Sequence, residues 1–314
     1  MNFMRTFFLV FFLLVFSLAN VFSQGCSDAG FCTMGAMRPN QSYNKSSKIA
    51  LRSIEISEYI GFNRFGDSYY STSIDANVGI NPKTSVQFKL PYTFVFGHFA
   101  NLSGLGDISL SATRNVWSTE KQQINATFGM KLPTGNADVK DNTGKDLPMY
   151  YQTTLGTYDI VLGASWITRG WMLAVGYQQP LNQIHNGFKW GLWNGDPDST
   201  NIKKYPVSNQ LIRGNDVMIR IERNFRFSRF NGYIGLLPIY RLTKDKIISP
   251  QTGQLVSADG SDGLAMTLLF GGGYRLSYNS GIKVLLGFAL VERKINPDGL
   301  SRTQVFTVGY EYRF

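Results

Sequence analysis

The side chains that most often carry metal ions or nucleophilic chemistry are scarce in this chain of 314 residues, which has two histidines and two cysteines. Hydrolysis by a serine nucleophile needs a histidine base in contact with the hydroxyl group. His98 and His185 both fall in stretches that we expect to be loops, and no serine stands beside His185 where such chemistry would need one. The sequence therefore predicts a protein that is not an enzyme and that uses no metal ion or cofactor.

The two cysteines lie close together near the N-terminus, in the run Cys26-Ser-Asp-Ala-Gly-Phe-Cys32. In an oxidising compartment such a pair is most simply a disulfide that closes a small loop. A metal site would need further ligands, and no histidine is nearby. We therefore expect a disulfide between Cys26 and Cys32, with a metal site as the less favoured alternative.

Charged residues of both signs recur singly, at alternate positions of stretches that are otherwise apolar or small. In a row that faces an enclosed space, such residues can set a transverse field, or they can pair with one another and fill the space. Both interpretations stay open for each residue. The candidates for a lumen-facing set are Glu55, Asp75, Lys89, Asp107, Lys131, Asp159, Asp216, Arg220, Glu222, Arg241, Arg275, Lys283, Arg293, Glu311 and Arg313.

The alternation that places these charges has a period of two, which is the signal of β-strands. In the last segment Phe306, Val308 and Tyr310 share one face, whereas Thr307 and Glu311 share the other. The same division into an apolar face and a polar or small face recurs upstream. The segments lie near residues 49–61, 68–80, 84–96, 105–117, 122–132, 152–167, 170–180, 213–225, 229–242, 263–277, 281–293 and 302–314.

Short and long connections alternate between these segments. Residues 168–170 are typical of the short ones, and the long ones lie near 133–151, 181–212 and 243–262. Outer-membrane barrels have short periplasmic turns and long outer loops. Inside a bilayer an unpaired backbone group costs several kcal/mol, so strands cross only as a closed barrel. The sequence therefore predicts an all-β fold: a closed antiparallel transmembrane β-barrel of about 12 strands over residues 49–314.

A soluble sandwich or lipocalin-like barrel is the alternative, and it would turn the apolar face inward. A soluble core of Ser, Asp, Asn and Lys would carry heavy desolvation costs. Aromatic residues such as Trp117, Trp166, Trp171 and Tyr312 also gather toward strand ends, as in the two interfacial girdles of membrane barrels. These features favour a barrel whose oily face contacts lipid of the outer membrane of a Gram-negative bacterium.

The N-terminus has the pattern of a secretory signal peptide. Arg5 precedes an apolar run that ends near Leu18, and small residues follow up to Ser23. We expect residues 1–23 to be a signal peptide; an uncleaved anchor is the alternative, although the apolar run is short for a membrane span. Residues 24–48 would then form a periplasmic N-terminal segment, either a small plug that enters the barrel or a disordered tail.

The formal net charge of +10 raises the question of nucleic-acid binding. Lys and Arg are scattered singly, however, and there is no basic run. An exported protein does not meet nucleic acid. Contact with anionic lipid or anionic solutes fits the charge better.

Three stretches resemble known outer-membrane proteins. The C-terminal Tyr310-Glu-Tyr-Arg-Phe314 resembles the signal, ending in Phe, by which the barrel-assembly machinery recognises its substrates. Gly104-Leu-Gly-Asp-Ile-Ser-Leu110 and Lys131-Leu-Pro-Thr-Gly135 are similar in order and distance to the outer-membrane family of the meta-pathway of phenol degradation, which is related to the fatty-acid-transporter barrels. Gly and Pro are also common at barrel corners in general. The Gln-started mature end and the Phe- and Asn-rich composition resemble exported proteins of Bacteroidetes.

The function that the sequence favours is an outer-membrane channel or transporter for small molecules, hydrophobic compounds among them. The alternatives are a phospholipase-like outer-membrane enzyme, since His185-Asn-Gly187 superficially resembles a phospholipase active-site run, and a structural or secretion-accessory barrel with a closed lumen. In the long loop 181–212, Phe188, Trp190 and Trp193 would either gather an apolar solute or pack over the barrel mouth. We expect packing.

Overall fold

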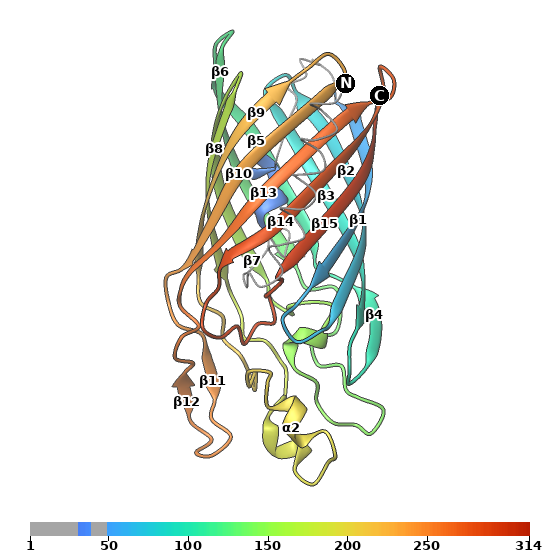
Figure 1. The fold of residues 1–314 in the computed structure, drawn as a ribbon. Helices are drawn as coiled ribbons and strands as arrows, with labels where there is room; N and C mark the ends of the chain where they lie inside the picture. Colours follow the sequence, from blue (N-terminus) through green and yellow to red (C-terminus); the bar gives the residue numbers. More distant parts are fainter. Residues whose placement is uncertain (1–30, 39–48) are drawn as a thin grey trace.

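The computed structural model describes residues 31–38 and 49–314, and it shows one closed antiparallel barrel (Figure 1). The predicted signal peptide and Cys26 lie outside the described residues. The wall consists of β1 (Ala50–Phe62), β2 (Ser68–Asn81), β3 (Thr84–Phe96), β5 (Ile108–Ser118), β6 (Gln122–Leu132), β7 (Asp159–Thr168), β8 (Trp171–Pro180), β9 (Asp216–Arg226), β10 (Phe230–Arg241), β13 (Gly263–Arg275), β14 (Ser280–Val291) and β15 (Gln304–Arg313).

Each of these twelve strands pairs with its neighbours along the chain, and the first strand pairs with the last. The β1–β15 register runs from Ser53 opposite Arg313 to Phe62 opposite Gln304, so no long edge strand remains. Closure satisfies the backbone groups that lipid could not. The predicted fold class and the number of strands are confirmed.

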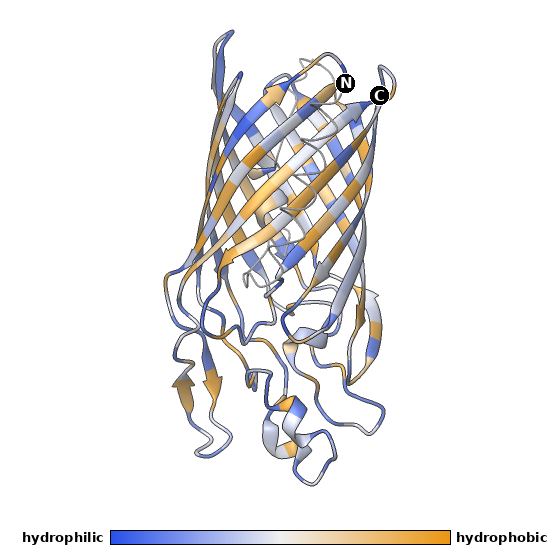
Figure 2. Cartoon of the chain, viewed as in Figure 1, coloured by the Kyte–Doolittle hydropathy of each residue, from blue (hydrophilic) through white to orange (hydrophobic). Residues whose placement is uncertain are grey.

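The two faces of the wall differ as the alternation predicts. On β2, Ile74 is 48% exposed on the outside and Ser73 is 3% exposed on the inside. On β5, Leu110 and Ser111 show the same contrast, at 44% and 2%. Apolar and polar residues alternate along the strands in Figure 2. The outer face is therefore oily over the height of the wall, which is the surface that a bilayer requires.

The two ends of the barrel are unlike. The C-terminus and the short turns lie at one end, and the long loops lie at the other (Figure 1). The loop end carries the hairpin of β11 (Lys246–Ile248) and β12 (Leu255–Ser257), together with the short helices η3 (Met149–Tyr151), η4 (Trp190–Trp193) and α2 (Ser199–Ile202). In barrels of this kind the short turns face the periplasm and the loops face outward.

The predicted strand 105–117 is interrupted. The structure has β4 (Asn101–Leu105) pairing with the outer end of β3 and β5 pairing with the remainder of β3. The break falls opposite Pro91, which has no N–H to donate to the ladder; Gly106 N instead donates to the Pro91 carbonyl at 3.0 Å. Asp107, at the break, leaves the ladder and becomes available to other partners.

The predicted strand 152–167 begins only at Asp159. Gly156 has a φ of +69°, which a β-strand does not allow. The Asp107 carboxylate accepts hydrogen bonds from the Leu155 N–H at 3.2 Å and from the Thr154 hydroxyl. This local capture holds residues 152–158 as a loop, and the prediction of a strand there was wrong.

No helix in the part of the chain that the structure describes is long and apolar enough to cross a membrane. The first two helical turns of the described residues, η1 (Phe31–Thr33) and η2 (Gly35–Met37), lie inside the barrel (Figure 1). There η2 contacts β5, β6, β7 and β8.

Candidate functional site

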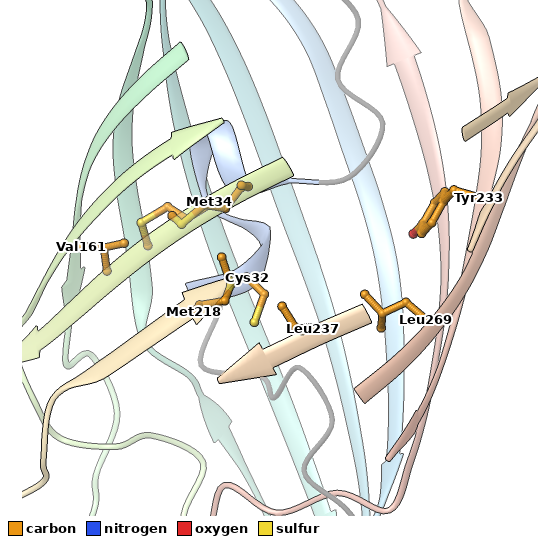
Figure 3. Close-up of a cluster of buried hydrophobic side chains, with 9 residues drawn as sticks. Cys32, Met34, Val161, Met218, Tyr233, Leu237 and Leu269 are labelled. Atoms are coloured by element: carbon orange, nitrogen blue, oxygen red, sulfur yellow. The ribbon is translucent and has the colours of Figure 1, made fainter. Parts of the chain in front are cut away.

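Residues 31–38 lie inside the lumen, and apolar contacts bury the middle of this segment. Met34 and Met37 are 2% and 0% exposed. Together with Cys32 they form one cluster with inward-facing wall residues, and Figure 3 shows the same group. The wall members of the cluster are Val161, Ala174, Met218, Tyr233, Leu237 and Leu269. We call these wall residues the apolar belt.

The backbone of this segment is also bound to the wall. Gly35 N donates to Gln87 Oε1 at 2.8 Å, and Ala36 N donates to Thr127 Oγ1 at 2.7 Å. Arg220 Nη1 donates to the Cys32 carbonyl at 3.2 Å. Polar backbone groups buried in a lumen need such partners, because an unpaired one costs about 1–3 kcal/mol. The segment is therefore fitted to this particular site on the wall.

Gly35 fits where no other residue would. Its φ is +49°, and a Cβ at this position would lie 2.4 to 2.6 Å from side-chain atoms of Thr113 and Thr127. Non-glycine residues rarely adopt this backbone conformation. The close approach of the segment to β5 and β6 thus depends on the absence of a side chain.

An inner charge network lies on the short-turn side of the segment. Arg38 Nη2 contacts Glu55 Oε2 at 2.6 Å, and its Nη1 contacts Asp75 Oδ1 at 3.4 Å. Lys283 Nζ reaches Glu55 at 2.7 Å and Glu311 at 3.1 Å. Arg38 therefore connects the N-terminal segment to charges that the wall already holds.

An outer charge network lies on the loop side, and Arg241 is its centre. Arg241 Nε and Nη2 donate to the two oxygens of Asp216 at 2.9 Å each. Its Nη1 donates to Asp245 Oδ2, and its Nη2 also donates to Asp298 Oδ2, both at 2.8 Å. The guanidinium group of Arg241, a residue 1% exposed, thus joins three carboxylates.

The same network extends along the wall toward β7 and β6. Arg213 Nε lies 3.2 Å from Asp298 Oδ2, and its Nη1 lies 3.3 Å from Asp159 Oδ2. Lys131 Nζ continues the chain of contacts, at 3.8 Å from Asp159 Oδ2 and 3.1 Å from Asp107 Oδ2. Together with Arg293, which contacts Asp216 at 3.4 Å, these residues link β6 and β7 to β9, β10 and the outer loops.

Burial and charge act in opposite directions on the loop carboxylates of this network. Burial favours the neutral form of Asp298, but Arg241, Arg213 and Arg293 hold its pKa well below the usual value. For Asp245 the order is reversed: burial raises its pKa, and Arg241 only partly offsets that effect. The network therefore depends on its cations to stay ionised.

The outer loops close over this network with an aromatic cap. Phe188 and Trp193 are 0% and 3% exposed and cluster with Tyr150, Tyr151 and Tyr205. Tyr151 and Tyr205 donate hydrogen bonds to the Asp67 carboxylate at 2.7 and 2.8 Å. Burial raises the pKa of both hydroxyl groups, and the adjacent Asp67 adds to that effect. Phe188 and Trp193 pack among the loop aromatics, as we expected from the sequence, whereas Trp190 stays 39% exposed.

The remaining candidates lie on the same inner face. Arg220 Nε donates to Glu222 Oε1 at 2.6 Å between the two networks, and both residues are buried. Arg313 contacts Glu311 at 2.5 Å in the inner network. Lys89 lies opposite Asp75 in the register of β2 and β3, and it is partly buried. Arg275 alone among the candidates is exposed, at the short-turn end of β13.

Sequence reasoning missed two groups of residues. Arg213, Asp245 and Asp298 come from loops that fold back onto the charges of the wall, and no strand period marks them. The apolar belt was missed although a signal was present: Ile160-Val161-Leu162 makes β7 apolar on both faces. A strand of that kind is buried on both sides, and in this barrel its inner side meets Met37.

Only one of the two cysteines of the expected disulfide, Cys32, lies within the described residues. Cys32 is disulfide-bonded, and Cys26 lies outside the described residues. Within residues 31–38 and 49–314, no group of three or more His, Cys, Asp or Glu side chains could hold a metal ion.

The two histidines are not placed for hydrolysis. His98 Nε2 lies 2.8 Å from Asp198 Oδ1 in the outer loops, and His185 is exposed. Over the described ranges, neither ring has a hydrogen bond with a serine hydroxyl. The geometry thus gives no support to a phospholipase-like site.

A closed antiparallel barrel with an oily outer face and an enclosed polar face is the fold of the outer-membrane β-barrels of Gram-negative bacteria, and the chain has this fold. More particularly, residues 60–177 match the family model described as "Putative MetA-pathway of phenol degradation". This is the family to which Gly104–Leu110 and Lys131–Gly135 pointed, and both stretches lie within the match. The predicted resemblance is confirmed.

The fold is similar to that of an outer-membrane channel from Pseudomonas putida F1, with a TM-score of 0.59 and 13% sequence identity over 88% of this chain and 99% of that one. The KdgM porin aligns with a TM-score of 0.43 and 10% identity over 83% of this chain and 99% of that one. The NanC porin aligns with a TM-score of 0.45 and 9% identity over 84% of this chain and 100% of that one. A comparison with curated protein sequences gives no match.

Proposed function

We propose that the protein is an outer-membrane channel for small organic molecules, and that residues 31–38 act as a plug that closes its lumen. The observation that carries the proposal is the burial of Met34 and Met37 against the apolar belt. The channel from Pseudomonas putida F1 has the same fold, which supports a channel but does not identify a solute.

The proposed solute has an apolar body. Displacement of the plug would uncover the apolar belt between two rings of charge. Val161, Leu237 and Leu269 would then offer an apolar surface to a passing molecule, and Met218 would adapt to its shape because methionine is flexible and polarisable. A family description that refers to phenol degradation is compatible with an aromatic compound.

The plug is held by contacts that can be exchanged. Arg38 shares Glu55 with Lys283, so Glu55 keeps a cationic partner when Arg38 leaves. The hydrogen bonds from Gly35 and Ala36 end on side chains of the wall, Gln87 and Thr127, which water can satisfy in an open lumen. Opening would therefore leave few buried polar groups unpaired.

The test is ion conductance across planar bilayers, with liposome swelling by solutes of graded size as the second readout. We expect the protein without residues 25–47 to conduct more strongly than the mature chain. Equal conductance in the two proteins would contradict the plug. Absence of conductance and of swelling in both would contradict a channel and would favour a structural barrel with a closed lumen.

A further inference from the structure

The short-turn end of the barrel holds an open cavity of about 1080 Å³, the vestibule. It is lined by the turns that join β5 to β6, β7 to β8 and β9 to β10, and by the adjoining ends of β13, β14 and β15. It lies opposite the outer network and is distinct from the apolar belt. No residue of the plug lines it.

Cations dominate the lining of the vestibule. Lys283 and Arg313 contact carboxylates of the inner network. The others form no ion pair within the described residues, and the acidic residues among the lining are Glu120 and Glu311. The unpaired cations of the lining are Lys121, Arg169, Arg226, Arg229 and Arg275.

The arginines are brought together by neighbouring strands. Arg275 N donates to the Arg229 carbonyl at 2.8 Å, and Arg226 lies opposite Asn231 on the adjacent strand. Gly170, next to Arg169, accepts a hydrogen bond from Asn224 N at 2.8 Å, which joins that turn to β9. Four arginines therefore come from adjacent turns and strand ends, and all four line the vestibule.

A cavity lined by one sign of charge and enclosed by walls of low dielectric constant concentrates counter-ions. Guanidinium groups bind carboxylates in a bidentate geometry and bind phosphates equally well. Unpaired arginines on the rim of an open cavity thus offer binding capacity that the protein itself does not use. Isolated surface cations would be fully solvated, but here they share one enclosed volume.

We propose that the vestibule is a binding site for small organic anions, carboxylates in particular, with Arg226, Arg229 and Arg275 as its principal contacts. The inference deepens the proposed function, since it assigns the charge of the solute at the inner mouth of the channel. The same chemistry would also bind the headgroup of an anionic lipid, and the experiment separates the two sources.

The experiment is isothermal titration of 1,2,4-benzenetricarboxylate into the full mature chain in nanodiscs of zwitterionic lipid at low ionic strength. The test variant is Arg226→Gln/Arg229→Gln/Arg275→Gln. The matched control, Lys189→Gln/Lys203→Gln/Lys204→Gln, removes the same charge from the outer loop. A unit charge about 8 Å from one bound carboxylate changes the affinity about two- to threefold through water, so three charges acting on a single carboxylate change it about tenfold, and this is a lower bound for an anion with three carboxylates.

We expect binding to weaken about tenfold or more in the test variant, in keeping with three removed charges, and to be unchanged in the control. Equal weakening in both variants, or no binding to the parent chain, would overturn the inference. Discs with phosphatidylglycerol form the second arm: if that lipid abolishes binding of the tricarboxylate, the site belongs to lipid and the inference fails.

The folding control is SDS gel electrophoresis of each variant before and after heating. A change in mobility on heating identifies a folded barrel. The titration does not depend on conductance. A barrel that conducts without binding the anion therefore refutes only this inference, and one that binds the anion without conducting refutes only the channel.

Discussion

Removal of the Arg241 guanidinium group is the sharpest test of the outer network. Arg241→Met keeps most of the side-chain volume but leaves Asp216, Asp245 and Asp298 without their central cation. Breaking a buried ion pair by removing one partner costs about 3–5 kcal/mol. Because three carboxylates lose a partner that is 1% exposed, we expect a loss of stability at the upper end of that range.

The assay is urea unfolding in lipid vesicles, followed by tryptophan fluorescence. Lys244→Met is the matched control: Lys244 lies 2.7 Å from Asp259 in an outer loop, with side chains that are 43% and 85% exposed. An exposed pair of this kind contributes little to stability, because water and salt screen it. Equal losses for Arg241→Met and Lys244→Met would refute the buried network as a brace of the barrel.

Two further predictions concern the outer loops. Asp298 has a lowered pKa in the folded protein, so the stability it contributes is complete above about pH 5 and is lost as the pH falls; the stability difference between the parent chain and Asp298→Asn should therefore shrink between about pH 5 and about pH 2 in urea titrations, and a constant difference over that range would contradict the lowered pKa. Tyr205→Phe removes a buried hydrogen bond to the Asp67 carboxylate and should cost about 1.5–3 kcal/mol; Tyr158→Phe, at an exposed position, should change stability by less than about 0.5 kcal/mol, and similar effects of the two changes would argue against the aromatic cap.

Much of the barrel is readable from the sequence because lipid imposes a strict period on it. A residue such as Ile74 must be apolar and its neighbour Asp75 must turn inward, whatever the rest of the chain does. The break at Pro91 and the loop around Gly156 are local exceptions, set by a missing donor and by a backbone conformation that glycine allows. The residue types Pro91 and Gly156 could be read from the sequence. The hydrogen bonds by which Asp107 holds the loop before β7 could not.

Many partners of the inward charges could not be predicted. Alternation fixes the face of Asp216 and Arg241, which lie opposite each other on β9 and β10, but it does not identify the loop carboxylates that Arg241 also meets. Arg213 and Asp298 depend on the path of long loops, which have no period. Arg38 and Met34 depend on the entry of a short segment into the barrel, and the apolar residues on both faces of β7 were the sequence signal for an internal partner.

The most direct test of the plug is the single-channel conductance of Gly35→Val. A side chain at Gly35 would collide with Thr113 and Thr127 and would require a strained backbone, so the plug should leave its site while the wall stays unchanged. Gly253→Val is the control, because Gly253 also has a positive φ, of 69°, but has no atom within 4 Å of an added Cβ.

We predict that Gly35→Val conducts as strongly as the protein without residues 25–47, and that Gly253→Val conducts like the parent chain. A folded Gly35→Val barrel with the conductance of the parent chain would contradict the assignment of residues 31–38 as the element that closes the lumen.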